Sequence, residues 1–168
     1  MSDAFETFPR IGLGWDLHHM QAGRPCLLAG LRLECPVGPA GHSDGDAVLH
    51  AITDAVLGAA GLPDLGTLFP DTDPQWQDAS SERFLHAALE RAAGLGLRIV
   101  SADVVLVCDR PKVAPHRDAL RKQLARQLDL PLDRVNLKGK TTEGTRTEEC
   151  IEATAVVLMM LVPRAGPS

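Results

Sequence analysis

The stretch Ile11-Gly12-Leu13-Gly14-Trp15-Asp16-Leu17-His18 alternates in the manner of a β-strand and predicts the first strand of the fold, over residues 10–20. Residues two apart on a strand project from the same face, about 6–7 Å apart along the chain. The side chains of Asp16 and His18 can therefore converge on one point. This pair by itself is also compatible with an exposed strand end.

A third candidate ligand, His50, lies in a helix-like segment that opens with His42-Ser43-Asp44-Gly45-Asp46. Many helical histidines only pack or form hydrogen bonds, so His50 alone does not decide its use. Together with Asp16 and His18, it forms a set of two imidazoles and one carboxylate. Such a set suits zinc, and three protein ligands leave a fourth position open for a substrate oxygen. The trio therefore indicates the metal centre of an enzyme.

The helix that carries His50 is expected to begin near Ser43. Ser43 can act as the N-cap, and Asp46 three residues later completes a capping-box pattern. The buried stripe of this helix is predicted from helical spacing as Val48, Ile52, Ala55 and Ala59. Asp46, His50 and Asp54 fall four apart on a neighbouring stripe, which is either functional or solvated.

The rest of the chain reads as an alternation of strands and helices. We expect a hairpin over 25–33 with its turn at Ala29-Gly30, a loop over 36–41, a loop over 61–73, helices over 81–93 and 116–128, and strands over 98–108, 133–138 and 150–162. These elements predict an α+β fold of two layers, a four-stranded mostly mixed sheet with helices on one face plus a small hairpin. The uncovered sheet face would need a partner, and self-association would bury it.

Composition is that of one globular domain. The chain has 168 residues, with 45% hydrophobic and 23% charged residues, which is enough to close its own core. We expect residues 1–9 to form a flexible N-terminal extension, residues 10–162 a single domain, and residues 163–168 a C-terminal tail. The net charge of −5 argues against a nucleic-acid partner, and means that a phosphorylated substrate would need local metal and basic groups.

The cysteines and the hydropathy point to a cytoplasmic protein. Four scattered cysteines without a C-x-x-C pair read as reduced thiols. No apolar stretch approaches the length of a membrane span, so no membrane partner is expected.

Two polar segments could bind phosphate. His42 and Ser43 sit where the helix is expected to begin, and the free N–H groups of a first turn make an anion site; the alternative is that Ser43 is only a cap. Thr141-Thr142-Glu143 follows a predicted strand, where hydroxyls could hold phosphate oxygens and Glu143 a hard cation. The alternative there is an ordinary polar turn. A basic helix face formed by Arg117, Arg121, Lys122 and Arg126 is interpreted as solvated.

Taken together, the segments resemble the 2-C-methyl-D-erythritol 2,4-cyclodiphosphate synthase family of the non-mevalonate isoprenoid pathway. The resemblance runs from residue 10 to about 161 and rests on several ordered motifs: residues 10–18, His42-Ser43-Asp44-Gly45-Asp46 with His50, Leu68-Phe69-Pro70-Asp71-Thr72-Asp73, Pro111-Lys112, and Thr141-Thr142-Glu143. It implies a homotrimer with its sheets around a central axis and its active sites between subunits. It also implies a cytidine diphosphate substrate, 4-diphosphocytidyl-2-C-methyl-D-erythritol 2-phosphate, closing to the cyclic 2,4-diphosphate with release of CMP.

The resemblance also assigns roles residue by residue. The implied metal ligands are Asp16, His18 and His50 for one Zn2+ per subunit, and Glu143 for a second divalent cation, Mg2+ or Mn2+. The implied transition-state residues are His42 and Thr141. The implied substrate contacts are Asp16, Leu17, His18, His42, Ser43, Asp64, Leu65, Gly66, Phe69, Pro70, Asp71, Thr72, Asp73, Thr142 and Glu143. The implied nucleotide pocket, on the adjacent subunit, consists of Cys108, Asp109, Arg110, Pro111, Lys112, Val113, Ala114, Lys140 and Thr141.

Two departures from the family pattern stand out. The loop over 144–150 is shorter than the family's glycine-rich loop and lacks its phenylalanine, which puts ligand binding at the trimer axis in doubt. Lys140 stands where the family usually has a threonine. Two rival functions remain open at this point: another metal-dependent phosphate enzyme such as a phosphohydrolase, and a non-enzymatic trimeric scaffold.

Overall fold

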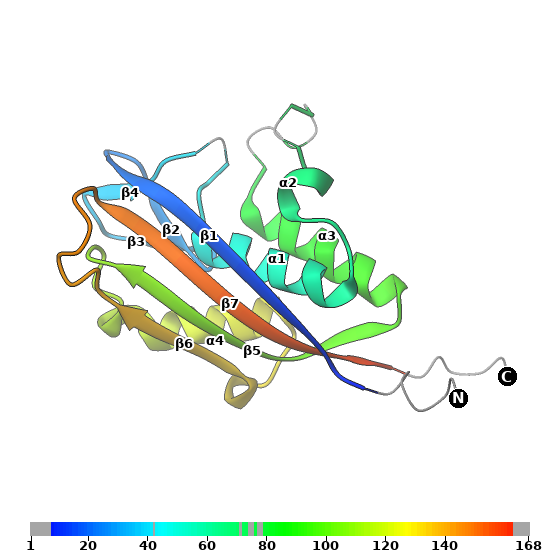
Figure 1. Cartoon of the computed structure of the whole chain (residues 1–168). Coiled ribbons are helices and arrows are strands. Elements are labelled where there is room, and N and C mark those ends of the chain that lie inside the picture. The colour runs from blue at the N-terminus through cyan, green and yellow to red at the C-terminus, as the bar shows by residue number, and fades with distance from the viewer. Residues whose placement is uncertain (1–7, 42, 71, 74–75, 77–78, 163–168) are drawn as a thin grey trace, which may run out of the picture.

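The computed structural model describes residues 8–41, 43–70, 72–73, 76 and 79–162. Its centre is a mixed five-stranded sheet in the order β4-β1-β7-β5-β6 (Figure 1). The strands are β1 (Arg10–Ala22), β4 (Val37–Pro39), β5 (Leu97–Cys108), β6 (Val135–Lys140) and β7 (Cys150–Leu161). Neighbours pair antiparallel except β5 and β6, which are parallel and joined through a helix. The expectations for residues 1–7 and 163–168 lie outside the described residues.

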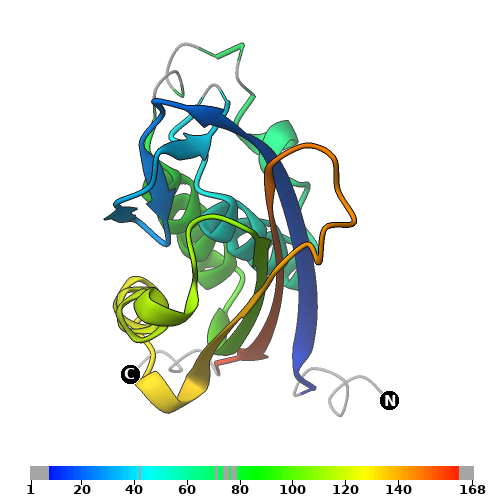
Figure 2. The same ribbon diagram turned by 90° about the vertical axis from the view of Figure 1, so that its left-hand side faces the viewer.

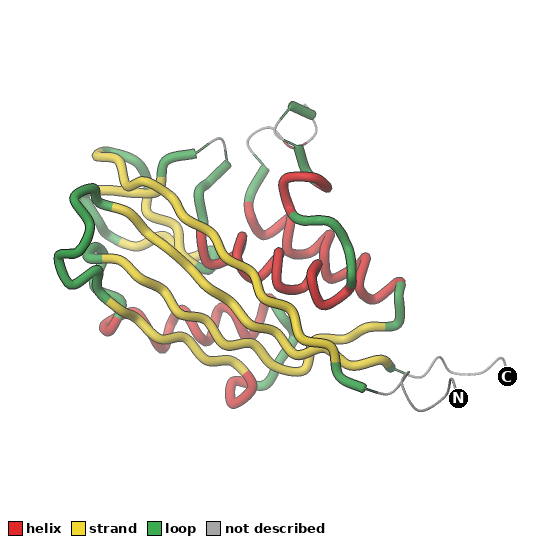
Figure 3. Tube along the Cα trace, viewed as in Figure 1, coloured by secondary structure: helices red, strands yellow, loops and turns green. Residues whose placement is uncertain are grey.

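The helices cover one face of this sheet, as Figure 2 shows with the sheet seen nearly edge-on. They are α1 (Ala47–Ala60), α2 (Leu65–Leu68), α3 (Ser81–Gly94) and α4 (Arg117–Gln127), with short 3-10 turns at Ala114–His116 and Leu132–Arg134. Figure 3 distinguishes the strands (yellow) from the helices (red) along the chain. The α+β class, the helices on one face and the final strand over residues 150–161 are confirmed.

The contact between α1 and β1 is unusually close because small residues face each other across it. A Cβ placed on Gly12 would lie 1.7 Å from the carbonyl oxygen of Ala55, and one on Gly14 would lie 1.9 Å from that of Ala51. Real Cβ atoms do not approach closer than about 3.0 Å, so only glycine lets the helix backbone rest on the strand. This packing brings the start of α1, with His50, beside the middle of β1.

The predicted hairpin is confirmed as β2 (Cys26–Leu28) and β3 (Leu31–Leu33), which pair with each other rather than with the main sheet. Its turn residues Ala29 and Gly30 have φ values of 52° and 77°, the positive angles that a tight two-residue hairpin turn requires. The buried carboxylate of Asp46 accepts the N–H groups of both turn residues, at 2.9 and 2.6 Å. The hairpin is thereby tied to the N-terminus of α1.

Three predictions about elements were wrong. The sheet has five strands rather than four, because part of the predicted loop over 36–41 forms β4, an edge strand where proline is tolerated. Helix α1 begins at Ala47 and is capped by Asp46, whose side chain accepts the Leu49 N–H. Ser43 is therefore not the N-cap; Gly45, with φ of 71°, breaks the chain direction between Ser43 and the helix. The predicted loop over 61–73 contains the short helix α2.

The opposite face of the sheet carries exposed apolar side chains. On β1 the residues that alternate with the buried glycines are Ile11, Leu13, Trp15 and Leu17, with Leu13 66% and Trp15 54% exposed. Val156 and Met160 of β7 extend this surface. A monomer does not normally expose so continuous an apolar strand face, so this sheet face has the composition of an interface.

Among the described residues, no helix combines the length and the apolar character that crossing a membrane requires.

Candidate metal centre and active site

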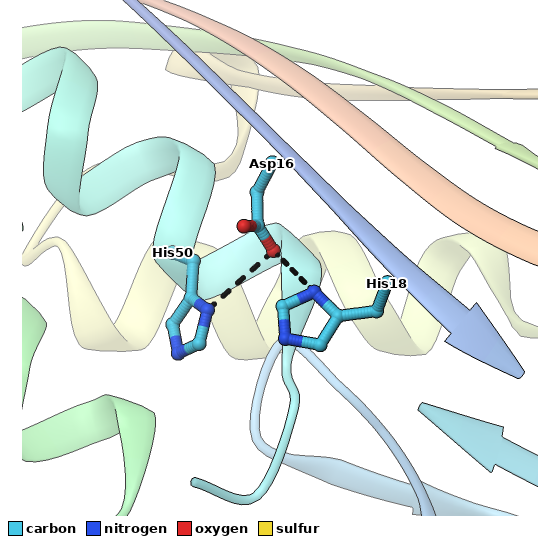
Figure 4. Close-up of side chains that lie close together, drawn as sticks. All are labelled: Asp16, His18 and His50. Atoms are coloured by element: carbon cyan, nitrogen blue, oxygen red, sulfur yellow. Dashed lines mark ion pairs between the residues drawn. The ribbon is translucent and has the colours of Figure 1, made fainter. Parts of the chain in front are cut away.

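The three predicted ligands converge between β1 and α1, as Figure 4 shows. Asp16 Oδ2 lies 2.8 Å from His18 Nδ1 and 3.4 Å from His50 Nδ1. The rings of His18 and His50 have their centroids 5.3 Å apart. One ligand atom from each residue lies within 4.8 Å of the other two. The predicted convergence of two strand residues and one helix residue is confirmed.

The donor set fits a metal ion. Asp16 Oδ2 and His18 Nδ1 are buried, and in the described part of the chain neither has a partner of hydrogen-bond geometry. Buried polar atoms are normally satisfied, so this pair faces a position that an external group should fill. Ligands of a tetrahedral zinc ion lie roughly 3.3 Å apart, since each bond is about 2.0–2.1 Å. The measured separations of the Asp16 oxygen from the two nitrogens are close to this spacing.

The electrostatics of the cluster favour a carboxylate beside imidazoles. Burial raises the pKa of Asp16, but the neighbouring His18 and His50 outweigh it and lower that pKa from 3.8 to about 2. Burial lowers the pKa of His50, but the contact with Asp16 raises it overall, above 6.5. Asp16 is therefore ionised at neutral pH and available as an anionic ligand.

Other polar groups surround the second nitrogen of His50. Its Nε2 lies 2.9 Å from Ser81 Oγ and 3.4 Å from Ser43 Oγ. Ser43, a predicted substrate residue, is thus brought to the edge of the metal centre, where its hydroxyl accepts the Gly45 N–H. His42 lies outside the described residues, as does Asp71. Leu17 projects to the opposite, exposed face of β1, away from the trio.

The predicted nucleotide residues gather around a separate cavity of about 580 Å³. Those that line it are Cys108, Lys112, Val113, Ala114, Lys140 and Thr141, together with Glu143 and three residues outside the predicted set, Arg117, Lys138 and Gly139. Its described lining includes none of Asp16, His18 and His50. Three lysines and one arginine give this cavity a positive wall, as an anionic ligand requires.

The segment 108–111 is held to the loop after β6. Asp109 accepts the Thr142 N–H at 3.2 Å and the Thr142 hydroxyl, which lowers the pKa of Asp109. Arg110 forms a two-point ion pair with Glu149 at 2.7 Å, and its peptide bond to Pro111 is cis. These bonds fasten the segment before Lys112 to the loop after β6, while Asp109, Arg110 and Thr142 are not among the residues that line the cavity. Glu143, with φ of 53°, accepts the Thr141 hydroxyl at the cavity rather than at the trio.

Of the predicted substrate residues, Asp64, Leu65 and Gly66 lie at α2, which is bound to α1. Asp64 caps α2, accepting the Thr67 N–H at 2.8 Å, and the Leu65 N–H is bound by Asp54 of α1 at 2.7 Å. Gly66 is part of this turn, and Pro70, Thr72 and Asp73 lie in the loop beyond it. Phe69 is 3% exposed and packs edge-on against Trp76, with the ring centroids 4.9 Å apart. Its ring is a core group, so any substrate contact at Phe69 would be made by its backbone.

The polar stripe left open by sequence spacing proves structural on both sides of His50. Asp46 is a fully buried cap, and Asp54 anchors α2.

The interpretation of the basic face of α4 as solvated holds for only part of that face. Arg117 donates to the Leu137 carbonyl at 2.8 Å and Arg121 to that of Val135 at 3.0 Å, which fastens α4 to β6. Sequence offered no signal for Ser81 or Arg117, because their partners are far away along the chain.

Fold and site together define an α+β protein with a candidate metal centre and a separate basic cavity. A model of the YgbB family matches residues 9–160. The chain belongs to the YgbB family.

Several curated relatives are named 2-C-methyl-D-erythritol 2,4-cyclodiphosphate synthase. A 2-C-methyl-D-erythritol 2,4-cyclodiphosphate synthase from Thermus thermophilus is 53% identical over 150 residues, covering 89% of this chain and 98% of the relative. The Aquifex aeolicus synthase is 49% identical, covering 80% and 86%. A solved synthase structure in a CDP-bound form matches with a TM-score of 0.86 and 49% identity, covering 89% and 99%. The predicted family and the prediction of an enzyme of this kind are confirmed.

Proposed function

We propose that this protein catalyses the metal-dependent cyclisation of 4-diphosphocytidyl-2-C-methyl-D-erythritol 2-phosphate to 2-C-methyl-D-erythritol 2,4-cyclodiphosphate with release of CMP, in the cytoplasm. The observation that carries the proposal is the convergence of Asp16, His18 and His50, in which the buried Asp16 Oδ2 and His18 Nδ1 have no hydrogen-bond partner among the described residues. The curated relatives with this activity, and the relative's CDP-bound structure, support the substrate class.

Asp16, His18 and His50 would hold one zinc ion, and Glu143 a second divalent cation, Mg2+ or Mn2+. Such ions supply charge neutralisation and alignment of the reacting phosphates. The nucleophile is the 2-phosphate of the substrate itself, which is ionised at neutral pH, so the chain needs no dedicated general base. Intramolecular attack on the β-phosphorus then expels CMP.

The remaining task of the chain is to fold the substrate back on itself. Ser43 lies beside His50, where its hydroxyl would bind a phosphate oxygen, and we assign His42 and Thr141 to the charge that develops during transfer. Lys112 and Lys140 line the cavity and would hold the nucleotide end. Fixing both ends of a flexible chain removes an entropic barrier of several kcal/mol.

We further propose a homotrimer in which each active site lies between subunits. The exposed apolar face of β1 and β7 supports burial against other copies of the chain. The metal centre and the nucleotide cavity have separate linings among the described residues. Two subunits can bring one of each together.

The test compares His50→Ala with His86→Ala, a helical histidine whose side chain is 75% exposed and pairs with Glu90. We expect His50→Ala to lose bound zinc and turnover together, while His86→Ala keeps both. Zinc is measured by elemental analysis and the products by phosphorus NMR. Full activity in a metal-depleted His50 variant would contradict the proposal, and release of CMP without a cyclic product would indicate a phosphohydrolase instead.

A further inference from the structure

The imidazole of His50 is held on both sides. Its Nδ1 faces Asp16 at 3.4 Å and its Nε2 lies 2.9 Å from the hydroxyl oxygen of Ser81. Ser81 is the first residue of α3 and is fully buried. Position 81 therefore places a hydroxyl against His50 from a helix that contributes no ligand to the metal centre.

The hydroxyl of Ser81 has a fixed direction. Asp44 accepts the Ser81 N–H at Oδ2, at 2.9 Å, and the Ser81 hydroxyl at Oδ1. Asp44 Oδ1 also accepts the N–H of Asp46 at 3.2 Å, which anchors the carboxylate to the start of α1. An ionised carboxylate only accepts hydrogen bonds, so the Ser81 hydroxyl must donate to Asp44 and can only accept from His50.

This direction determines which nitrogen of His50 carries the proton. Since Ser81 Oγ accepts, His50 Nε2 must be the protonated nitrogen, and Nδ1 is left with a free lone pair directed at Asp16 and His18. Metal ligation requires a neutral imidazole whose lone pair faces the ion. The hydrogen-bond partner of the other ring nitrogen commonly fixes this tautomer. Ser43 is a weaker partner for Nε2, because its oxygen lies 3.4 Å away and already accepts the Gly45 N–H.

We propose that Asp44 and Ser81 are positioning residues that orient His50 and fix its tautomer, so that Nδ1 is presented to the metal while the Ser43 hydroxyl stays available for substrate. The inference rests on the proposed metal centre. The bond from Ser81 to His50 spans the gap between α3 and α1, so the affinity for zinc depends on how α3 docks.

The test uses Ser81→Ala and, as a matched control, Ser80→Ala. Ser80 precedes α3, is exposed and makes no capping hydrogen bond with its side chain. Zinc affinity is measured on the purified full chain by competition with a chromophoric chelator, and Co2+ spectra report the geometry. Loss of an outer partner of a ligating histidine typically weakens metal binding about 10–100-fold. We expect a loss of this size in Ser81→Ala, a similar change in Asp44→Asn, and wild-type affinity in Ser80→Ala.

The outcomes separate this inference from the metal centre itself. If the wild-type chain binds neither zinc nor Co2+, the proposed centre fails. If it binds zinc and Ser81→Ala binds equally well, only the positioning by Ser81 is overturned. Should Ser81→Ala fail to fold, 15N NMR of the imidazoles in the zinc-loaded wild type decides: protonated Nε2 and metal-bound Nδ1 on His50 are expected, and the reverse would overturn the inference.

Discussion

The close contact of α1 with β1 makes Gly14 the most sensitive point for testing how the fold builds the site. In Gly14→Ala, the new Cβ would lie 1.9 Å from the Ala51 carbonyl oxygen and 2.6 Å from the Ala55 nitrogen. Both atoms belong to the helix backbone and cannot swing aside. The helix must therefore move away by about 1 Å for this contact to relax to 3.0 Å.

A displacement of this size has two consequences. Overpacking of a well-packed core typically costs about 1–3 kcal/mol, and the rigid obstacle here places Gly14→Ala at the upper end. For a domain of this length, a loss of about 3 kcal/mol lowers the melting temperature by about 6–12 °C. The same shift carries His50 away from Asp16, and ligand positions must hold to within about 0.5 Å. We expect zinc affinity to fall at least tenfold.

Gly58→Ala is the matched control. Gly58 lies within α1 on its exposed side, and its Cβ would only touch the Leu13 carbonyl oxygen at 3.8 Å. Because glycine inside a helix is disfavoured against alanine by about 0.5–1 kcal/mol, this variant should gain stability and keep its zinc. Calorimetry and chelator competition on both variants measure the two effects. Unchanged melting and zinc affinity in Gly14→Ala would refute the reasoning.

Three further predictions concern the cavity, the sheet face and pH. Lys112→Ala should weaken CMP binding by calorimetry about tenfold, whereas Lys122→Ala, outside that cavity, should not. Leu13→Asp should convert the proposed trimer to monomers in light scattering, because a charge enters the apolar face; a monomeric wild type would contradict this. In the metal-free protein, folding lowers the pKa of Asp16 from 3.8 to about 2, so its contribution of about 2 kcal/mol is present above pH 4 and lost towards pH 2. The raised pKa of His50 adds stability below pH 6.5 that disappears as pH rises. Urea unfolding across this pH range measures the effect in the wild type and in His50→Gln. The same pH dependence of the unfolding free energy in both proteins would contradict the prediction.

Strong local patterns predicted most elements correctly. The strand predicted from the β-branched residues over 98–108 is β5. The residues predicted from helical spacing to be buried, Val48, Ile52, Ala55 and Ala59, lie on the buried side of α1. Such patterns succeed because burial of one face is decided by periodicity along the chain itself. The convergence of Asp16 and His18, two of the three candidate metal ligands, was predicted for the same reason, since residues two apart on a strand lie on one face.

The errors arose where distant segments compete with local signals. The prolines in 36–41 suggested a loop, yet Val37–Pro39 pairs with the end of β1 because an edge strand needs partners on one side only. Ser43 and Asp46 both look like caps. Asp46 is the N-cap of α1 because the hairpin turn, at Ala29, supplies its carboxylate with a further hydrogen-bond donor.

The sequence by itself determined the strand that carries Asp16 and His18, the helix that carries His50, and the family, because each depends on residues close together along the chain. Only the tertiary structure decided how these ligands are held. Gly12 and Gly14 let α1 touch β1, and Ser81 arrives from α3 to direct one imidazole. Such arrangements depend on backbone approach and hydrogen-bond direction between segments far apart in sequence, which no local pattern encodes.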